Sequence, residues 1–177
     1  MPGTRSSDRR QHGFTLVEVV IAIVVMGILA AVGSSMISDT FKTARIVDAS
    51  QGSADQARYA MERLAREIRE VKAVGGSYSI GTMGPTTMVF TRTINGADVT
   101  VTIAKSGNNL TLGYSSPAVT SNLATQVTGF ALDFLKLDNT ATVSAADVRF
   151  VVITLTVTDA TSGQVMQEKT RIALRNA

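Results

Sequence analysis

The chain contains no cysteine and only one histidine among its 177 residues. Without cysteine it cannot form a disulfide, a thiolate metal site or a thiol nucleophile. The one histidine, His12, lies in the polar segment that begins the chain. Catalysis or metal binding by histidine is therefore excluded from everything that follows this segment.

The chain also has little net charge, with 17 lysines and arginines against 14 aspartates and glutamates. In residues 1–13, Arg5, Arg9 and Arg10 outweigh Asp8 and so carry two of the three net positive charges. The remainder is close to neutral. The pI of about 9.5 therefore does not predict a nucleic-acid partner.

One long apolar run is present. Residues 14–33 read FTLVEVVIAIVVMGILAAVG and contain a single formal charge, Glu18. A helix of this length spans roughly 30 Å, the thickness of the hydrocarbon core of a bilayer. The arginines before it favour a cytoplasmic N-terminus, with the chain after about residue 35 exported. A carboxylate in a membrane helix costs about 2.5–3.5 kcal/mol, so we expect a partner for Glu18.

The sequence GFTLVE at residues 13–18, with basic residues before it and an apolar helix after it, resembles the processing motif of type IV pilins and pseudopilins. The resemblance implies that a prepilin peptidase cleaves after Gly13 and N-methylates Phe14. The new amino group would lie one helical turn from the Glu18 carboxylate, at i and i+4. The resemblance implies that this pairing joins adjacent subunits during assembly. The alternative is a plain signal anchor in which GFTLVE occurs by chance.

Helical periodicity continues through residues 36–76. An apolar stripe begins with Met36, Ile37, Phe41, Ala44 and Val47, weakens at residues 49–53, and returns strongly at Ala57, Ala60, Met61, Leu64, Ala65, Ile68 and Val71. We therefore expect one helix from Phe14 to Val74, ended by Gly75-Gly76.

The other face of this helix is charged, with five basic and four acidic residues between Asp55 and Lys72. Such a mixture predicts a solvent-exposed, self-paired face rather than a nucleic-acid surface. The expected i,i+4 ion pairs are Arg58–Glu62, Glu62–Arg66, Arg63–Glu67 and Arg66–Glu70.

After residue 76 the apolar pattern takes the period of two that is typical of strands. We expect strands at 86–94, 98–105, 110–114, 126–138, 148–158 and 165–174, with hairpin turns at Asn95-Gly96 and 159–163. Phe130, Leu132 and Phe134 should share one face. Hairpins in sequence order predict an antiparallel sheet that covers the amphipathic helix, an α+β fold. The pilin resemblance implies the same arrangement.

These patterns divide the chain into four segments. They are a cleaved basic leader at 1–13, a transmembrane or filament-core helix at 14–35, an amphipathic continuation of this helix at 36–76, and an antiparallel β-rich domain at 77–177.

The β-rich domain offers little chemistry. Its acids Asp133, Asp138, Asp147 and Asp159 are scattered near predicted strand ends and are interpreted as turn residues. Residues 138–140 lack the number of ligands that a calcium loop needs. Ser144 and the threonines have no base beside them. We expect no catalytic residue, no cofactor and no metal, and a protein that is not an enzyme.

Within the family, the helix ARYAMERLAREIREVK and the ending KTRIALRNA look most like minor pilins and J-type minor pseudopilins of type II secretion. This resemblance implies a structural subunit of a filament tip or priming complex. Its expected partners are the prepilin peptidase/N-methyltransferase and other pilins or pseudopilins, with no nucleic acid. It would lie in the bacterial inner membrane, with its C-terminal domain in the periplasm, before it enters a pilus or pseudopilus. The alternatives are a ligand-binding minor pilin for adhesion or DNA uptake and a signal-anchored periplasmic protein that is not assembled.

Overall fold

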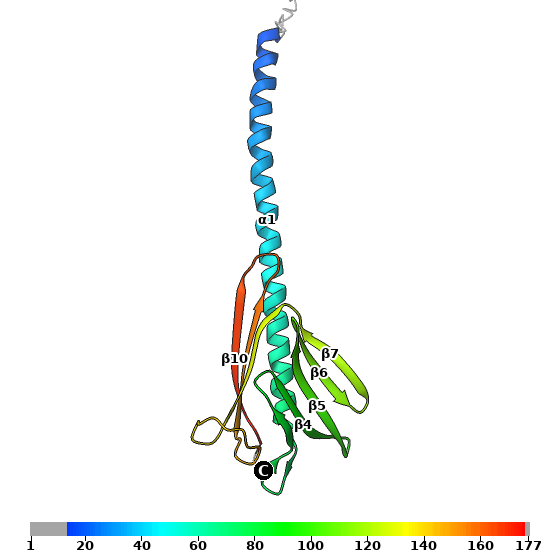
Figure 1. Cartoon of the computed structure of the whole chain (residues 1–177). Helices are drawn as coiled ribbons and strands as arrows, with labels where there is room; N and C mark the ends of the chain where they lie inside the picture. Colours follow the sequence, from blue (N-terminus) through cyan, green and yellow to red (C-terminus); the bar gives the residue numbers. More distant parts are fainter. Residues whose placement is uncertain (1–13, 176–177) are drawn as a thin grey trace, which may run out of the picture. The chain divides into compact units, whose positions relative to one another are not determined.

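The computed structural model describes residues 14–175, with the backbone alone at Ser35, as one long helix followed by antiparallel strands (Figure 1). The helix α1 comprises Leu16–Arg69. The strands are β1 (Ala73–Val74), β2 (Ser77–Tyr78), β3 (Ile80–Met83), β4 (Thr87–Ile94), β5 (Ala97–Ser106), β6 (Asn109–Ser115), β7 (Ala118–Ala124), β8 (Val127–Leu135), β9 (Phe150–Thr158) and β10 (Val165–Ala173). The fold is therefore α+β, as the sequence predicts.

The chain divides into two compact units, and the boundary falls inside α1, between Arg45 and Ile46. In the first unit the helix exposes large apolar side chains on all sides, for example Leu16 (83 % exposed), Ile23 (65 %) and Met26 (74 %). Helices that are apolar all round are typical of membrane spans and of buried cores. Among the described residues, α1 is the one helix that is long and apolar enough to cross a membrane.

In the second unit, the strong part of the predicted apolar stripe is the buried face of α1. All of its members are at most 9 % exposed: Ala57, Ala60, Met61, Leu64, Ala65, Ile68 and Val71. They join one hydrophobic cluster with strand residues such as Phe90, Ile103 and Leu155. Full burial of a leucine or isoleucine contributes about 1.5–3 kcal/mol, so this face holds the helix on the strands.

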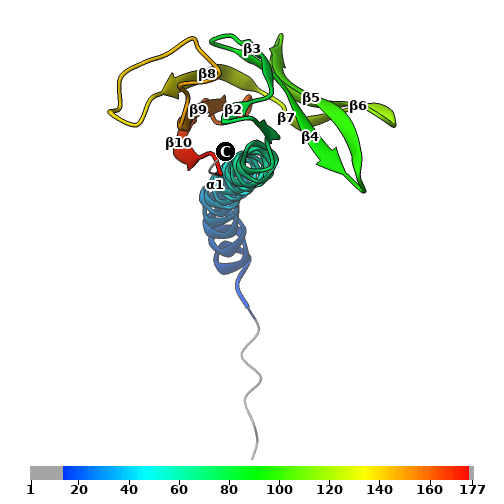
Figure 2. The same cartoon turned by 90° about the horizontal axis from the view of Figure 1, so that it is seen from below.

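The strands form two main sheets, whereas the hairpin order predicted one. The five-stranded sheet has the order β3-β4-β5-β6-β7 and the three-stranded sheet the order β10-β9-β8, while β1 and β2 form a separate hairpin. Figure 2 shows the three-stranded sheet on one side of the end of α1 and the five-stranded sheet on the other. The chain changes sheet between β7 and β8, where Gln126 has a φ of 58°. Phe130, Leu132 and Phe134 share one face of β8, as predicted, and this face is buried.

The helix bounds differ from the prediction at both ends. The helix begins at Leu16 rather than Phe14 and ends at Arg69 rather than Val74. At the C-terminal end the N–H of Lys72 donates to the carbonyl of Thr91 on β4 (2.8 Å), so pairing with the sheet replaces a further helical turn. Gly75 and Gly76 do not end the helix. With φ values of 60° and 85° they form the two-residue turn of the β1–β2 hairpin.

Besides the two-residue strands β1 and β2, two strands of the main sheets were not predicted, β3 and β7. Both lie at the edges of the five-stranded sheet. Strand β7 (AVTSNLA) is exposed from Ala118 to Asn122, so no alternation of apolar residues marks it. The predicted turn at Asn95-Gly96 is confirmed, since both residues have a positive φ, 51° and 81°.

Candidate functional site

The start of α1 is capped by its own sequence. The hydroxyl oxygen of Thr15 accepts a hydrogen bond from the N–H of Glu18 (3.3 Å), and the carbonyl of Thr15 accepts one from Val19 (3.3 Å). Thr15 is therefore the N-cap and Glu18 the N3 residue, the spacing of a capping box. A carboxylate in the first turn also interacts favourably with the helix dipole. The sequence TLVE at residues 15–18 was the signal that could have shown this cap.

The predicted processing residues lie at and before this cap. Gly13 lies outside the described residues. Phe14 precedes the first helical residue by two positions and is 80 % exposed. It is not part of the helix, so the helical i,i+4 spacing between Phe14 and Glu18 is not present here. Glu18 is exposed among exposed apolar side chains, without an ion-pair partner among residues 14–175.

A second charged site lies on the second-unit part of α1, on the face that the sequence assigned to solvent. Glu67 is fully buried and forms ion pairs with Arg63 (2.9 Å) on its own helix and with Arg92 on β4. The predicted Arg63–Glu67 pair thus forms, but in a buried setting. Arg63 also donates to the Tyr114 hydroxyl on β6 (2.7 Å). Burial, and after it the Glu67 carboxylate, raises the pKa of Tyr114.

Arg63, Glu67 and Arg92 form a charged cluster, called the Glu67 cluster below, which continues the inner face of the five-stranded sheet. Met88 and Phe90 are buried on β4, and Arg92 follows them at the same alternation. Oε1 of Glu67 and Nε of Arg92 have no hydrogen-bond partner in the part of the chain that the structure describes. Two arginines and one glutamate leave an excess of one positive charge in the cluster. Its contacts are structural.

The weak part of the helix stripe, residues 49–53, has a structural role of its own. Ser53 donates to Asp159 (3.1 Å), and Ser50 donates to Gln164, in the turn between β9 and β10. One turn further along the helix, the side-chain oxygen of Gln56 accepts the N–H of Thr125 (3.1 Å). The polar patch and Gln56 therefore hold two strand-connecting turns, which sequence periodicity could not reveal.

Asp159 organises the β9–β10 turn. Its Oδ1 accepts hydrogen bonds from the N–H groups of Thr161 (3.0 Å) and Ser162 (2.6 Å) and from the Ser162 hydroxyl (2.8 Å). The bonds from Ser162, followed by those from Ser53 and Thr161, lower the pKa of Asp159. This is the turn role that the sequence predicts for the residue.

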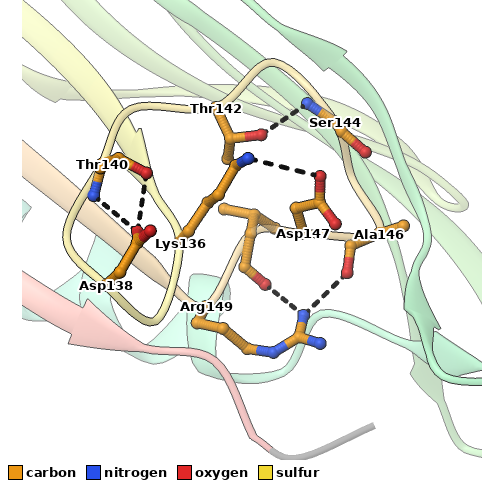
Figure 3. A network of polar contacts seen from close by, with 9 residues as sticks. Lys136, Asp138, Thr140, Thr142, Ser144, Ala146, Asp147 and Arg149 are labelled. Carbon is orange, nitrogen blue, oxygen red and sulfur yellow. Dashed lines mark hydrogen bonds and ion pairs between the residues drawn. The ribbon is translucent and has the colours of Figure 1, made fainter.

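The long β8–β9 connection is organised in the same way (Figure 3). Asp138 accepts hydrogen bonds from the N–H (3.0 Å) and hydroxyl (2.7 Å) of Thr140, and these bonds lower the pKa of Asp138. Oδ2 of Asp147 lies 3.9 Å from Nζ of Lys136, an ion pair. Within residues 14–175, no group of three or more potential ligands among Asp, Glu, Cys and His comes together to hold a metal. Asp138 and Asp147 therefore shape a loop.

One comparison with known families identifies the N-terminal segment. Residues 8–34 match the prokaryotic N-terminal methylation motif. This is the motif of type IV pilins, and the match supports the pilin and pseudopilin family that the sequence resembles. It implies processing by a prepilin peptidase and assembly with other pilins. None of the curated proteins matches the chain.

The fold and the motif agree. A methylation motif at the start of an apolar helix, with antiparallel sheets after it, supports a type IV pilin-like protein. The apolar segment at the start of α1 fits a membrane anchor for such a protein.

Proposed function

We propose that this protein is a structural, non-enzymatic subunit of a type IV pilus or of a type II secretion pseudopilus, and a minor subunit rather than the major one. A prepilin peptidase cleaves it after Gly13 and methylates Phe14. It is held in the bacterial inner membrane, with the N-terminus cytoplasmic and the second unit periplasmic, until its helix enters a filament tip or priming complex.

The observation that carries the proposal is the pairing of the methylation motif with an apolar helix that contains one acid. In the first unit, the side chains of residues 16–32 are exposed on all sides, and a surface of this kind needs lipid or other helices around it. Glu18 is costly in either setting without a partner. The amino group of a cleaved Phe14, on the same or a neighbouring subunit, supplies the opposite charge.

Two measurements test this function. Mass spectrometry of the full chain, expressed with its prepilin peptidase, should show the loss of residues 1–13 and a methyl group on Phe14. An intact N-terminus under these conditions would contradict the proposal.

In the same system we expect Glu18→Ala to be cleaved normally but to enter filaments about tenfold less, because a tenfold loss corresponds to only about 1.4 kcal/mol of pairing energy. Asp39→Ala is the matched control, an exposed acid further along the same helix that pairs with the exposed Lys42. Equal incorporation of the two variants would rule out the charge pairing of Glu18.

A further inference from the structure

Strand β10 is a regular strand with a free edge. It pairs with β9 through nine residues without a bulge, and it ends the order β10-β9-β8. The opposite edge of this sheet is covered. There the N–H of Leu132 on β8 donates to Pro85 (2.8 Å), and the N–H of Val127 donates to Asn108 (2.9 Å). An uncovered edge strand offers a row of unpaired backbone groups.

The residues of β10 whose backbone groups face outward can be identified. The N–H of Leu174 donates to Arg149 (3.0 Å), and the carbonyl of Gln164 accepts from Asp159 (2.9 Å), so these two even-numbered residues face the β9 side. Backbone direction alternates along an antiparallel strand. The N–H and C=O groups of the odd-numbered residues therefore face the free edge: Val165, Gln167, Lys169, Arg171 and Ala173.

Open cavities flank both faces of this edge strand. On the inner face, a groove of about 650 Å³ lies between Glu168 and Thr170 of β10 and residues such as Met61 and Arg66 of α1. On the outer face, a pocket of about 470 Å³ is lined by Leu135, Val152 and Arg171, among others. A strand added at the β10 edge would send alternate side chains into these two cavities.

The inner groove exists because β10 is fixed to the rest of the second unit near its ends. Gln164, just before β10, accepts a hydrogen bond from Ser50 of α1. Just after β10, the carbonyl of Arg175 accepts one from the Tyr78 hydroxyl. Between these contacts, Met61 and Ala65 line the groove beside the strand.

The charges of both cavities favour an acidic occupant. The inner groove is lined by Arg58, Arg66, Arg69 and Arg175 against three glutamates. None of these arginines forms an ion pair within the described residues, so the i,i+4 pairs that the sequence predicted for Arg58 and Arg66 are absent there.

The outer pocket has Lys169 and Arg171 against Asp133. Arg171 is held in position by stacking on Phe150 (3.7 Å to the ring centroid) and by a hydrogen bond to Asn139. The side chain of Lys169 has no ion-pair partner in residues 14–175.

A second copy of this chain fits the edge poorly. At full antiparallel overlap of the two strands, Lys169 would lie opposite Lys169 of the other copy, and like charges across strands are destabilising. Its free β7 edge carries no charged residue. From the open edge, the two flanking cavities and their positive excess, we propose that β10 binds an extended, acidic segment of a different protein by strand addition. This proposal stands apart from the proposed function.

Hydrogen exchange on the full chain in nonionic detergent tests the proposal. The probes are two synthetic peptides, one alternating Thr and Glu and one alternating Thr and Lys. We expect the Glu peptide to slow amide exchange in β10 and the Lys peptide to leave it unchanged. Lys169→Glu should weaken binding of the Glu peptide about tenfold and improve binding of the Lys peptide, as expected for the loss of one charge contact.

A backbone variant separates strand addition from simple charge attraction. Gln167→Pro removes an outward N–H but no ladder bond to β9, so the strand should still form while peptide protection is lost. Gln167→Ala is the matched control and should bind normally. If Gln167→Pro lowers the melting temperature, its loss of peptide protection could reflect unfolding. The peptide preference of Lys169→Glu then decides whether the proposal holds.

Three results would overturn the proposal. They are unchanged exchange in β10 with the Glu peptide, equal protection by both peptides, and pairing of two copies through β10 in the absence of peptide.

Discussion

Glu67 is a carboxylate with no exposed surface, held between arginines from two different elements. The ion pairs that it forms with Arg63 and Arg92, whose side chains remain 33 % and 19 % exposed, must offset the desolvation cost of this carboxylate. Glu67 needs the arginines, because a buried charge without its partner is far more costly than none. The Glu67–Arg92 ion pair is also a polar contact between α1 and β4 in an otherwise apolar interface. It can form at only one position of the helix along the strand.

We expect Glu67→Ala to lower the free energy of unfolding by about 3–5 kcal/mol, because it leaves Arg63 and Arg92 facing each other without an anion. The double variant Glu67→Met, Arg92→Met should recover much of this loss, since apolar residues of similar volume can replace a buried ion pair. Denaturant unfolding of the full chain in detergent measures both effects.

The matched control for Glu67 is Glu62→Ala on the same helix, at an exposed position. Its effect should stay within about 0.5 kcal/mol, as for surface substitutions in general. If Glu67→Ala is as mild as Glu62→Ala, the ion pairs of Glu67 contribute nothing net to stability.

The part of α1 in the second unit has two kinds of contact with the strands. Its apolar face joins the hydrophobic cluster, while Ser50, Ser53 and Gln56 bind the turns that connect strands. Hydrogen bonds of this kind contribute about 0.5–1.5 kcal/mol each, less than the apolar face but with a fixed geometry. The bonds of Ser50 and Ser53 position the tip of the β9–β10 hairpin on the helix, and that of Gln56 positions the β7–β8 connection.

The contact of the β9–β10 turn with α1 should depend on pH. The folded state lowers the pKa of Asp159, so its stabilising effect is complete above the unfolded value of about 3.9 and is lost as the pH falls through the lower folded value. We expect Asp159→Asn to be less stable than the wild type at pH 7. The gap, which is the difference in free energy of unfolding between the two proteins, should narrow below about pH 4.

Urea midpoints at neutral and acidic pH measure this gap. Asp98 and Asp138 also have lowered pKa values, but they are common to both proteins and cancel in the difference. A constant gap across the whole pH range would show that the charge of Asp159 is not involved.

Sequence patterns predicted the elements wherever one period dominates. The strong helix stripe from Ala57 to Val71 and the Asn95-Gly96 turn are local signals, and both are confirmed. Glu67 was assigned to solvent because its partner Arg92 lies 25 residues away, on a strand whose position against the helix no local pattern contains. Strand β7 was missed because an exposed edge strand has no buried face to mark it.

At the candidate site, the motif could be recognised from the sequence because it is a fixed order of adjacent residues, and the family comparison confirms it at residues 8–34. The capping of the helix by Thr15 has a local signal as well, because TLVE has the spacing of a capping box. The free edge of β10 and its two cavities were not readable at all, since they depend on how three segments distant in sequence come together.

At the scale of the whole molecule, the hydrophobic core belongs to the second unit alone. No residue before Ala57 is among the buried core residues in the part of the chain that the structure describes. A chain that begins at Ile46 should therefore fold without detergent. Its melting temperature should stay within a few degrees of that of the full chain, since 1 kcal/mol shifts a domain of this size by about 4 °C.

Circular dichroism of the two chains measures this. A chain that begins at Arg66 is the control, because it lacks Ala57, Ala60, Met61 and Leu64, and we expect it to remain unfolded. Aggregation or disorder of the chain from Ile46 would mean that the first unit is required for folding.

The contact between Ser53 and Asp159 joins residues 106 positions apart in the chain. At a synthesis rate of about 5–20 residues per second, the hairpin tip that binds Ser53 is made roughly 5–20 s after the serine itself. For that interval, the apolar stripe of α1 has only part of its final covering. Synthesis of the last hairpin therefore sets the time until which the apolar stripe of a newly made chain is partly exposed and open to aggregation. Any chaperone that protects this stripe has to act within those seconds.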